Sequence, residues 1–266
     1  MQVRGAGREE GQVEFAYPDG ARVRLTHADA PSLLAEVAAR LEAGQGFALA
    51  TLNVDHLEKL GREAGFRAAY AAHDLVVADG NPVVWLSRLS GRPVGLVPGS
   101  DLVVPLVRAA TAAGVGVALI GGRGESLVRA AARLGREVPG ARIVLTHAPG
   151  FPFDPTGADA EAVADRISRS GAGLCLLALG APRQEIFAAF ARRRLPGVGF
   201  ASIGAGLDFL AGDQRRAPRL VRRARMEWLW RMLSDPRRLA GRYARGFMIL
   251  PGHARRAWRS RHRRSP

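Results

Sequence analysis

Polar residues stand directly after apolar segments of this chain, which is where enzymes built on parallel sheets hold their ligands. Asp79 follows the apolar run Leu75–Ala78, and Thr51 and Asn53 stand at the end of an earlier run. A carboxylate in this setting can act as a general base that removes a proton from a hydroxyl group. Asp, Asn and Thr are also common helix caps and turn residues. The sequence leaves both interpretations open for the three residues.

A second group of candidates follows the apolar runs further along the chain. Gly121 and Gly122 precede a helical pattern, and the amides at the start of a helix favour phosphate. The segment lacks the third glycine of the G-x-G-x-x-G pattern, so it is either a phosphate loop or a tight turn. Gln184 follows a Gly-Ala-Pro turn and offers both a donor and an acceptor, and Asp208 can accept hydrogen bonds from ribose, uracil or a sugar. Each of these residues, taken singly, also fits a structural role.

Metal chemistry has little support in the sequence. The six His residues show no ligand spacing, and neither H-E-x-x-H nor Asp-x-Asp occurs. The single cysteine, Cys175, excludes an intrachain disulfide and a cysteine-based zinc site. We therefore expect a site without a metal and without a cofactor.

Apolar runs that alternate with helical patterns are the elements that must position these residues. They predict an α/β fold with a mostly parallel, Rossmann-like sheet covered by helices on both faces. The turn Pro18-Asp19-Gly20 predicts an N-terminal β-hairpin. The expected strands are Phe47–Thr51, Leu75–Ala78, Val115–Ile120, Arg142–Thr146, Leu174–Leu179 and Val198–Ser202. The expected helices are Ser32–Ala43, Asp55–Ala71, Pro82–Ser90, Asp101–Ala113, Glu125–Glu137, Asp159–Ser170 and Gln184–Arg194.

The charge of the chain divides it into two parts. The 266 residues carry a net charge of +15, and the segment from Arg215 onward, with 17 Arg and two acidic residues, carries all of it. We therefore expect a neutral core over residues 1–214 and a basic appendage over residues 215–266. A basic segment on a neutral body indicates a polyanionic partner, either nucleic acid or an anionic membrane.

The composition of the basic appendage favours the membrane. Three of the four Trp residues lie there, among them Trp228 and Trp258, and tryptophan prefers membrane interfaces. Its arginines alternate with Trp, Leu and Met, as in an interfacial helix. No run reaches the roughly 18 apolar residues of a membrane-spanning helix, and the polar segment Met1–Gly11 is unlike a secretory signal. We expect a cytoplasmic protein bound peripherally to the inner face of the membrane.

An ordered set of short motifs resembles the WecG/TagA/CpsF family, glycosyltransferase family 26. The resemblance runs from about Ala50 to Tyr243. The motifs are Thr51-Leu52-Asn53, Ala78-Asp79-Gly80, Pro98–Leu102, Gly121-Gly122, Gly180–Glu185, Asp208–Gly212, Arg216-Ala217-Pro218, Glu227–Arg231 and Asp235–Leu239.

The resemblance implies an inverting, metal-independent transfer of a sugar from a UDP-sugar, such as UDP-linked N-acetylmannosamine. The implied acceptor is a sugar attached through pyrophosphate to undecaprenyl, in teichoic acid or other cell-surface polysaccharide synthesis. Asp79 corresponds to the proposed base and Thr51 to a residue beside it, while Gln184 and Asp208 correspond to nucleotide contacts. In the membrane-associated appendage, Arg237, Arg238 and Arg242 correspond approximately to basic residues that complete the site.

Two positions depart from the family pattern. Leu96 stands where family members often carry an arginine, so another residue, such as Arg92 or one in the appendage, must meet that phosphate. Asn81-Pro82 replaces a more usual x-Gly after Asp79-Gly80, so the sugar specificity does not carry over.

Other classes of protein remain open. One alternative is a nucleic-acid-binding protein with a Rossmann-like body, for which the chain has no binding motif, and another is a nucleotide-dependent oxidoreductase. The sequence also leaves open whether the appendage completes the site of its own chain or that of a neighbouring copy in a homo-oligomer.

Overall fold

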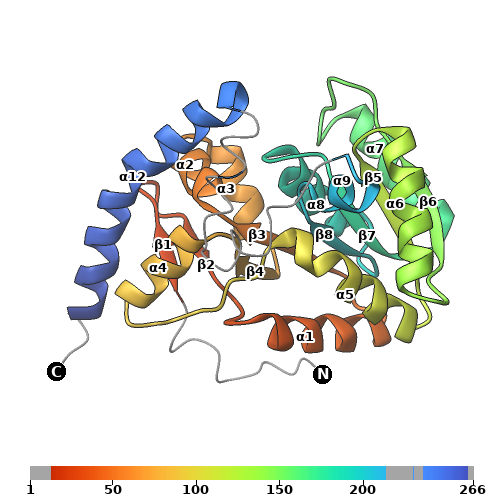
Figure 1. The fold of residues 1–266 in the computed structure, drawn as a ribbon, viewed down its shortest axis with the longest axis horizontal. Helices are drawn as coiled ribbons and strands as arrows, with labels where there is room; N and C mark the ends of the chain where they lie inside the picture. Colours follow the sequence, from red (N-terminus) through yellow and green to blue (C-terminus); the bar gives the residue numbers. More distant parts are fainter. Residues whose placement is uncertain (1–12, 214–229, 231–235, 263–266) are drawn as a thin grey trace.

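The computed structural model describes residues 13–213, residue 230 and residues 236–262. Its centre is a parallel six-stranded sheet with the strand order β4-β3-β8-β7-β5-β6 (Figure 1). The strands are β3 (Phe47–Leu52), β4 (Leu75–Ala78), β5 (Gly116–Gly121), β6 (Ile143–His147), β7 (Ala172–Ala178) and β8 (Gly199–Ser202). The predicted α/β class, with its mostly parallel sheet and N-terminal hairpin, is confirmed.

Helices cover both faces of the sheet. They are α1 (Ala30–Glu42), α2 (Val54–Arg62), α3 (Ala64–Ala71), α4 (Asn81–Leu89), α5 (Gly99–Ala112), α6 (Gly124–Glu137), α7 (Ala158–Ser170), α8 (Arg183–Arg194) and α9 (Gly206–Ala211). The buried residues of α1, α5, α6 and α9 form one core cluster with Leu49 of β3, whereas Ala48 and Ala50 belong to the clusters on the other face. Neighbouring residues of a strand point to opposite faces, so burial on both faces explains why the strands read as continuous apolar runs.

Two peripheral elements lie against one end of the sheet. β1 (Glu14–Ala16) and β2 (Arg22–Arg24) form the antiparallel hairpin. The long helix α12 (Pro236–His262) runs along the same side of the molecule, next to α2, β1 and α4 (Figure 1). The carboxyl-terminal part of the chain thus packs on the body through a helix that begins at a proline, a residue well suited to a first helical turn.

The expected single helix over Asp55–Ala71 is wrong. The chain forms α2 and α3 instead, because Glu63 adopts an extended conformation between them. Leu60 and Phe66 are both fully buried, but six residues of continuous helix would turn their side chains about a third of a turn apart. Because the helix breaks at Glu63, Leu60 of α2 and Phe66 of α3 can both lie in the core.

Candidate active site

The predicted site residues follow strands that end at the same edge of the sheet. After β3 the chain crosses to β4 on one side, whereas after β8 it continues into α9, which packs on α5 and α6 on the other side. Adjacent strands whose connections leave in opposite directions open a crevice at their carboxyl ends, and such crevices bind ligands in open α/β sheets. The junction of β3 and β8 is therefore the structural candidate for a site.

At this junction, Asp79 and Thr51 both lie close to Gly99. The backbone amide of Asp79 donates to the carbonyl of Leu52 at 2.8 Å, which holds Asp79 at the end of β3. The amide of Gly99, at the start of α5, lies 3.5 Å from Oδ2 of Asp79. A Cβ on Gly99 would lie only 3.2 Å from Oγ1 of Thr51. The carboxylate, the hydroxyl and the start of a 14-residue helix thus share one small region.

The Asp79 carboxylate thus faces the start of α5, where the first amides of a helix carry partial positive charge. An ionised carboxylate is the form that can accept a proton from a hydroxyl group. Gly99 belongs to the motif Pro98–Leu102, but the sequence alone predicted no role for it. The closeness of Gly99 to Thr51 and Ile203 explains why a side chain at this position would be poorly tolerated.

Asn53 has the helix-capping role that the sequence left open. Its Oδ1 accepts a hydrogen bond from the amide of His56 at 3.1 Å, and its backbone is extended, as is usual for an N-cap. It nevertheless borders the candidate base, because a Cβ on Gly80 would lie 3.9 Å from the Cβ of Asn53. Asn53 therefore fixes the start of α2 beside Asp79.

Gly121, Gly122 and Asp208 form a second group, at the end of β5. Gly121 has φ +115°, and a Cβ there would lie 2.5 Å from the carbonyl of Ala178. Gly122 also has positive φ, and a Cβ on it would lie 3.7 Å from Oδ1 of Asp208. The structure thus brings the glycine pair and Asp208 together. The Asp208 carboxylate can accept hydrogen bonds from hydroxyl and N–H donors but repels a phosphate. A phosphate bound at the start of α6 would therefore not contact Asp208.

Gln184 and Glu185, in the first turn of α8, are buried rather than open to the crevice. Their exposed fractions are 2% and 0%. Nε2 of Gln184 donates to Oε1 of Glu185 at 2.7 Å. Within the described residues, Oε1 of Gln184 and Oε2 of Glu185 have no hydrogen-bond partner. Burial is the main reason that the pKa of Glu185 rises from 4.5 to about 7, although the bond from Gln184 and the charge of Lys59 oppose the rise.

Several buried side chains connect this pair to α2 and α3. His56 hydrogen-bonds through Nδ1 to the Tyr70 hydroxyl at 2.6 Å, and its Nε2 lies 4.0 Å from Oε1 of Glu185. Burial raises the pKa of Tyr70 well above its ordinary value, and the charges of Glu185 and Asp79 raise it further. The charges of Glu185 and Asp79 thus both act on the Tyr70 hydroxyl.

Lys59 joins the same region to the turn before α8. Its Nζ donates to the Ala181 carbonyl at 3.1 Å and to Oδ2 of Asp55 at 2.9 Å. No sequence motif predicted a role for Glu185, His56, Tyr70 or Lys59. The only sequence signal for Glu185 was its position beside Gln184. A charged residue at a helix start is usually exposed, so the sequence did not predict the burial of Glu185.

The predicted residues of the basic appendage are only partly described. Trp228 lies outside the described residues. Arg237, Arg238 and Arg242 belong to α12, but their side chains also lie outside the described part. Trp258 of α12 has an exposed fraction of 51%.

Helix α12 approaches the candidate site through α2. A Cβ on Gly246 would lie 3.2 Å from Cγ2 of Val54, the residue that follows Asn53. Arg245 of α12 also lies 4.0 Å from Glu58 of α2. Helix α12 thus contacts Val54, the residue next to the Asn53 cap, and Asn53 in turn borders Asp79.

Leu96 and Arg92, which bear on the first departure from the family pattern, both lie in the described part of the chain. Leu96 is exposed in the segment before α5. Arg92, suggested as a substitute, instead lines a separate cavity between the hairpin, α4 and α12. Among the described residues, no group of three or more His, Cys, Asp or Glu side chains could hold a metal ion. No helix of the described part is long and apolar enough to cross a membrane.

The fold and the residues at its carboxyl edge define an α/β protein with a candidate ligand site at the junction of β3 and β8. The profile described as "Glycosyl transferase WecG/TagA/CpsF family" matches residues 19–265, so the chain belongs to this family of glycosyltransferases. The chain is similar to a Bacillus spizizenii protein named N-acetylglucosaminyldiphosphoundecaprenol N-acetyl-beta-D-mannosaminyltransferase. The two are 28% identical over 199 residues, which cover 74% of this chain and 75% of the relative.

Proposed function

We propose that this protein transfers a sugar from a UDP-linked donor to a sugar carried on undecaprenyl diphosphate, with inversion and without a metal or cofactor. The name of the Bacillus relative supports an acceptor of this kind and a role in cell-surface polysaccharide synthesis. The observation that carries the proposal is the convergence of Asp79, Thr51 and the start of α5 at the crevice between β3 and β8.

In the proposed reaction, the Asp79 carboxylate takes the proton of the acceptor hydroxyl. The hydroxyl oxygen then forms a bond to the anomeric carbon of the donor while the bond from that carbon to UDP breaks. UDP leaves with the bonding electron pair, and attack from the opposite face inverts the anomeric centre. Thr51, close to Gly99, would orient the acceptor, while Asn53 holds the start of α2 in place.

The donor nucleotide belongs, in this proposal, at the neighbouring strand ends. Asp208 beside Gly122 would accept hydrogen bonds from the nucleoside, and the start of α6 would face its phosphates. Gln184 contributes from the first turn of α8. Its buried amide has one oxygen without a partner among the described residues, and a bound ligand or water would satisfy that oxygen.

The basic appendage, residues 215–266, would hold the enzyme on the anionic inner face of the cytoplasmic membrane. There it would meet its lipid-linked acceptor. Arg237, Arg238 and Arg242 would contact the acceptor pyrophosphate, because a guanidinium group can bind phosphate through two hydrogen bonds. The proposal requires no nucleic acid, and it leaves open whether neighbouring copies share the appendage.

The substitution Asp79→Asn tests the proposal. General-base assistance contributes about 10²–10⁴-fold, so turnover should fall by about that factor while UDP binding and folding persist. The assay combines a panel of UDP-sugars with a lipid-diphosphate-linked sugar acceptor. Asp159→Asn, an exposed position on α7, is the matched control and should turn over normally. Near-normal turnover in folded Asp79→Asn protein would remove the assigned base.

A further inference from the structure

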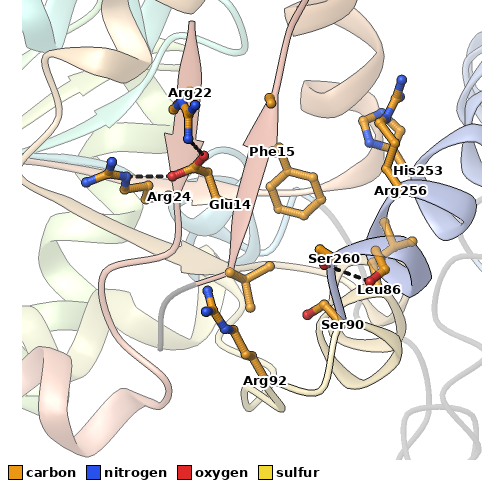
Figure 2. Close-up of a pocket in the computed structure, with 13 residues that line it drawn as sticks. Glu14, Phe15, Arg22, Arg24, Leu86, Ser90, Arg92, His253, Arg256 and Ser260 are labelled. Carbon is orange, nitrogen blue, oxygen red and sulfur yellow. Dashed lines mark hydrogen bonds and ion pairs between the residues drawn. The ribbon is translucent and has the colours of Figure 1, made fainter. Parts of the chain in front are cut away.

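A cavity of about 450 Å³ lies between the hairpin, α4 and α12 (Figure 2). The hairpin supplies Phe15 and Arg22 to it, α4 supplies Leu86, and α12 supplies Arg256 and Ser260. None of the residues assigned to the candidate active site lines it. The cavity is therefore a separate feature that the proposed sugar transfer does not use.

The described residues that line this cavity are strongly cationic. Four of them are arginines, at positions 22, 24, 92 and 256, whereas Glu14 is the only acidic one. Glu14 accepts hydrogen bonds from both Arg22, at 2.6 Å, and Arg24, at 2.8 Å (Figure 2). One carboxylate thus pairs with two arginines, whose side chains remain 61% and 50% exposed.

His253 adds no charge to the cavity at neutral pH. Burial, helped by the positive charge of Arg256, lowers the pKa of His253 to about 4. The lining residues therefore carry more positive than negative charge near pH 7. Guanidinium groups from the hairpin and from α12 are well suited to a phosphate oxygen, with which arginine forms short, charge-assisted hydrogen bonds.

The remaining wall of the cavity is apolar. Phe15 and Leu86 are almost completely buried, and Ala257 of α12 lines the cavity as well. The Phe15 ring packs edge-on against His253, with centroids 5.8 Å apart. A free inorganic anion would use only the arginines. A molecule that joins an anionic group to an apolar part would use both walls.

Exposed tryptophans are the sequence neighbours of two residues that line this cavity. Trp258 follows Ala257 on α12 and is 51% exposed, and Trp85 precedes Leu86 on α4 and is 46% exposed. Exposed tryptophan is favoured at the headgroup level of a bilayer. We propose that the cavity is a binding site for the headgroup phosphate of an anionic phospholipid. The inference is independent of the proposed sugar transfer, but it rests on the attachment of the appendage to an anionic membrane proposed above and deepens it.

The test uses lipid monomers, so that binding does not depend on a membrane surface. The full chain is titrated with dihexanoyl phosphatidylglycerol below its micelle concentration, and binding is followed by calorimetry. Dihexanoyl phosphatidylcholine and inorganic phosphate are the comparison ligands. We expect saturable binding of one phosphatidylglycerol per chain and much weaker binding of the other two. Equal binding of phosphatidylcholine, or of inorganic phosphate, would overturn the assignment.

Two variants of equal charge locate the site. Arg22→Gln/Arg256→Gln removes two cavity arginines, and it should weaken phosphatidylglycerol binding about tenfold or more. Arg255→Gln/Arg259→Gln removes two exposed arginines of α12 that do not line the cavity, and it should weaken binding less than about threefold. Equal losses in the two variants would show diffuse attraction and overturn the proposal. Circular dichroism establishes that both variants fold.

A UDP titration of the same proteins separates this inference from the proposed function. Wild-type protein that binds UDP but not phosphatidylglycerol would overturn the lipid site alone. Wild-type protein that binds phosphatidylglycerol but not UDP would count against the proposed function and support the lipid site. The cavity variant should retain the UDP affinity of the wild type.

Discussion

Glu185 should make the stability of this protein fall as the pH rises, and Glu185→Gln should remove that effect. The side chain is fully buried, and its pKa is about 7 in the folded protein against 4.5 for an ordinary glutamate. At 1.36 kcal/mol per pH unit, this difference corresponds to about 3 kcal/mol. No solvent screening reduces the figure, because no part of the side chain is exposed.

The sign of the effect follows from proton binding. Between pH 4.5 and 7 the folded protein keeps the proton of Glu185 while the unfolded chain releases it. The free energy of unfolding therefore falls as the pH rises, wherever the folded state binds more protons. The contribution of Glu185 is largest below pH 4.5 and is lost above pH 7. Glutamine keeps the shape of the protonated side chain but cannot ionise.

Urea unfolding of wild type and Glu185→Gln from pH 4.5 to pH 8 measures this contribution. The difference between the two proteins cancels the other titrating groups. Relative to wild type, the variant should gain about 3 kcal/mol across this range. Glu125→Gln, whose side chain is 94% exposed, is the control and should show a nearly constant difference. A pH-independent difference for Glu185→Gln would refute the reasoning.

Three further predictions concern the proposed reaction. Gln184→Ala and Asp208→Ala should each weaken UDP binding about tenfold, measured by calorimetry, and unchanged affinity in both would exclude them as nucleotide contacts. EDTA should leave turnover intact, so loss of activity that Mg²⁺ or Mn²⁺ restores would contradict a metal-independent reaction. A chain ending before Arg215 should lose transfer to a short, soluble acceptor while keeping part of its UDP binding, and normal transfer would reduce the appendage to a solvated extension.

The sequence predicted the strands well because all of them except the edge strand β6 are largely buried on both faces. Leu75–Ala78 was predicted without error, since four apolar residues between polar neighbours allow few other placements. The strand order could not be predicted from the sequence, because the pairing of β3 with β8 joins segments about 150 residues apart. The short helix α9 was also missed. It has six residues and begins among glycines, so local periodicity gave no signal for it.

The candidate site was only partly predictable, and burial is the reason. Strand-end position correctly brought Asp79 near Thr51, and Gly122 near Asp208, because parallel strands end at one edge. The same reasoning gave no sign that Gln184 is 2% exposed and bonded to Glu185. Two adjacent polar residues in a sequence do not reveal that both are covered by α2 and α3.

The packing of α12 explains how one appendage could serve both the membrane and the acceptor. Gly246 touches Val54 beside the Asn53 cap, so this point of the helix is fixed relative to the candidate base. At 1.5 Å per residue, Arg242 lies about 6 Å along the helix on one side of that contact, and Trp258 lies about 18 Å away on the other. Arginines near the site and an exposed tryptophan far from it therefore occupy one continuous element. A helix held at this contact would set the distance between the bilayer and Asp79, so that membrane binding and acceptor placement would become one geometric constraint.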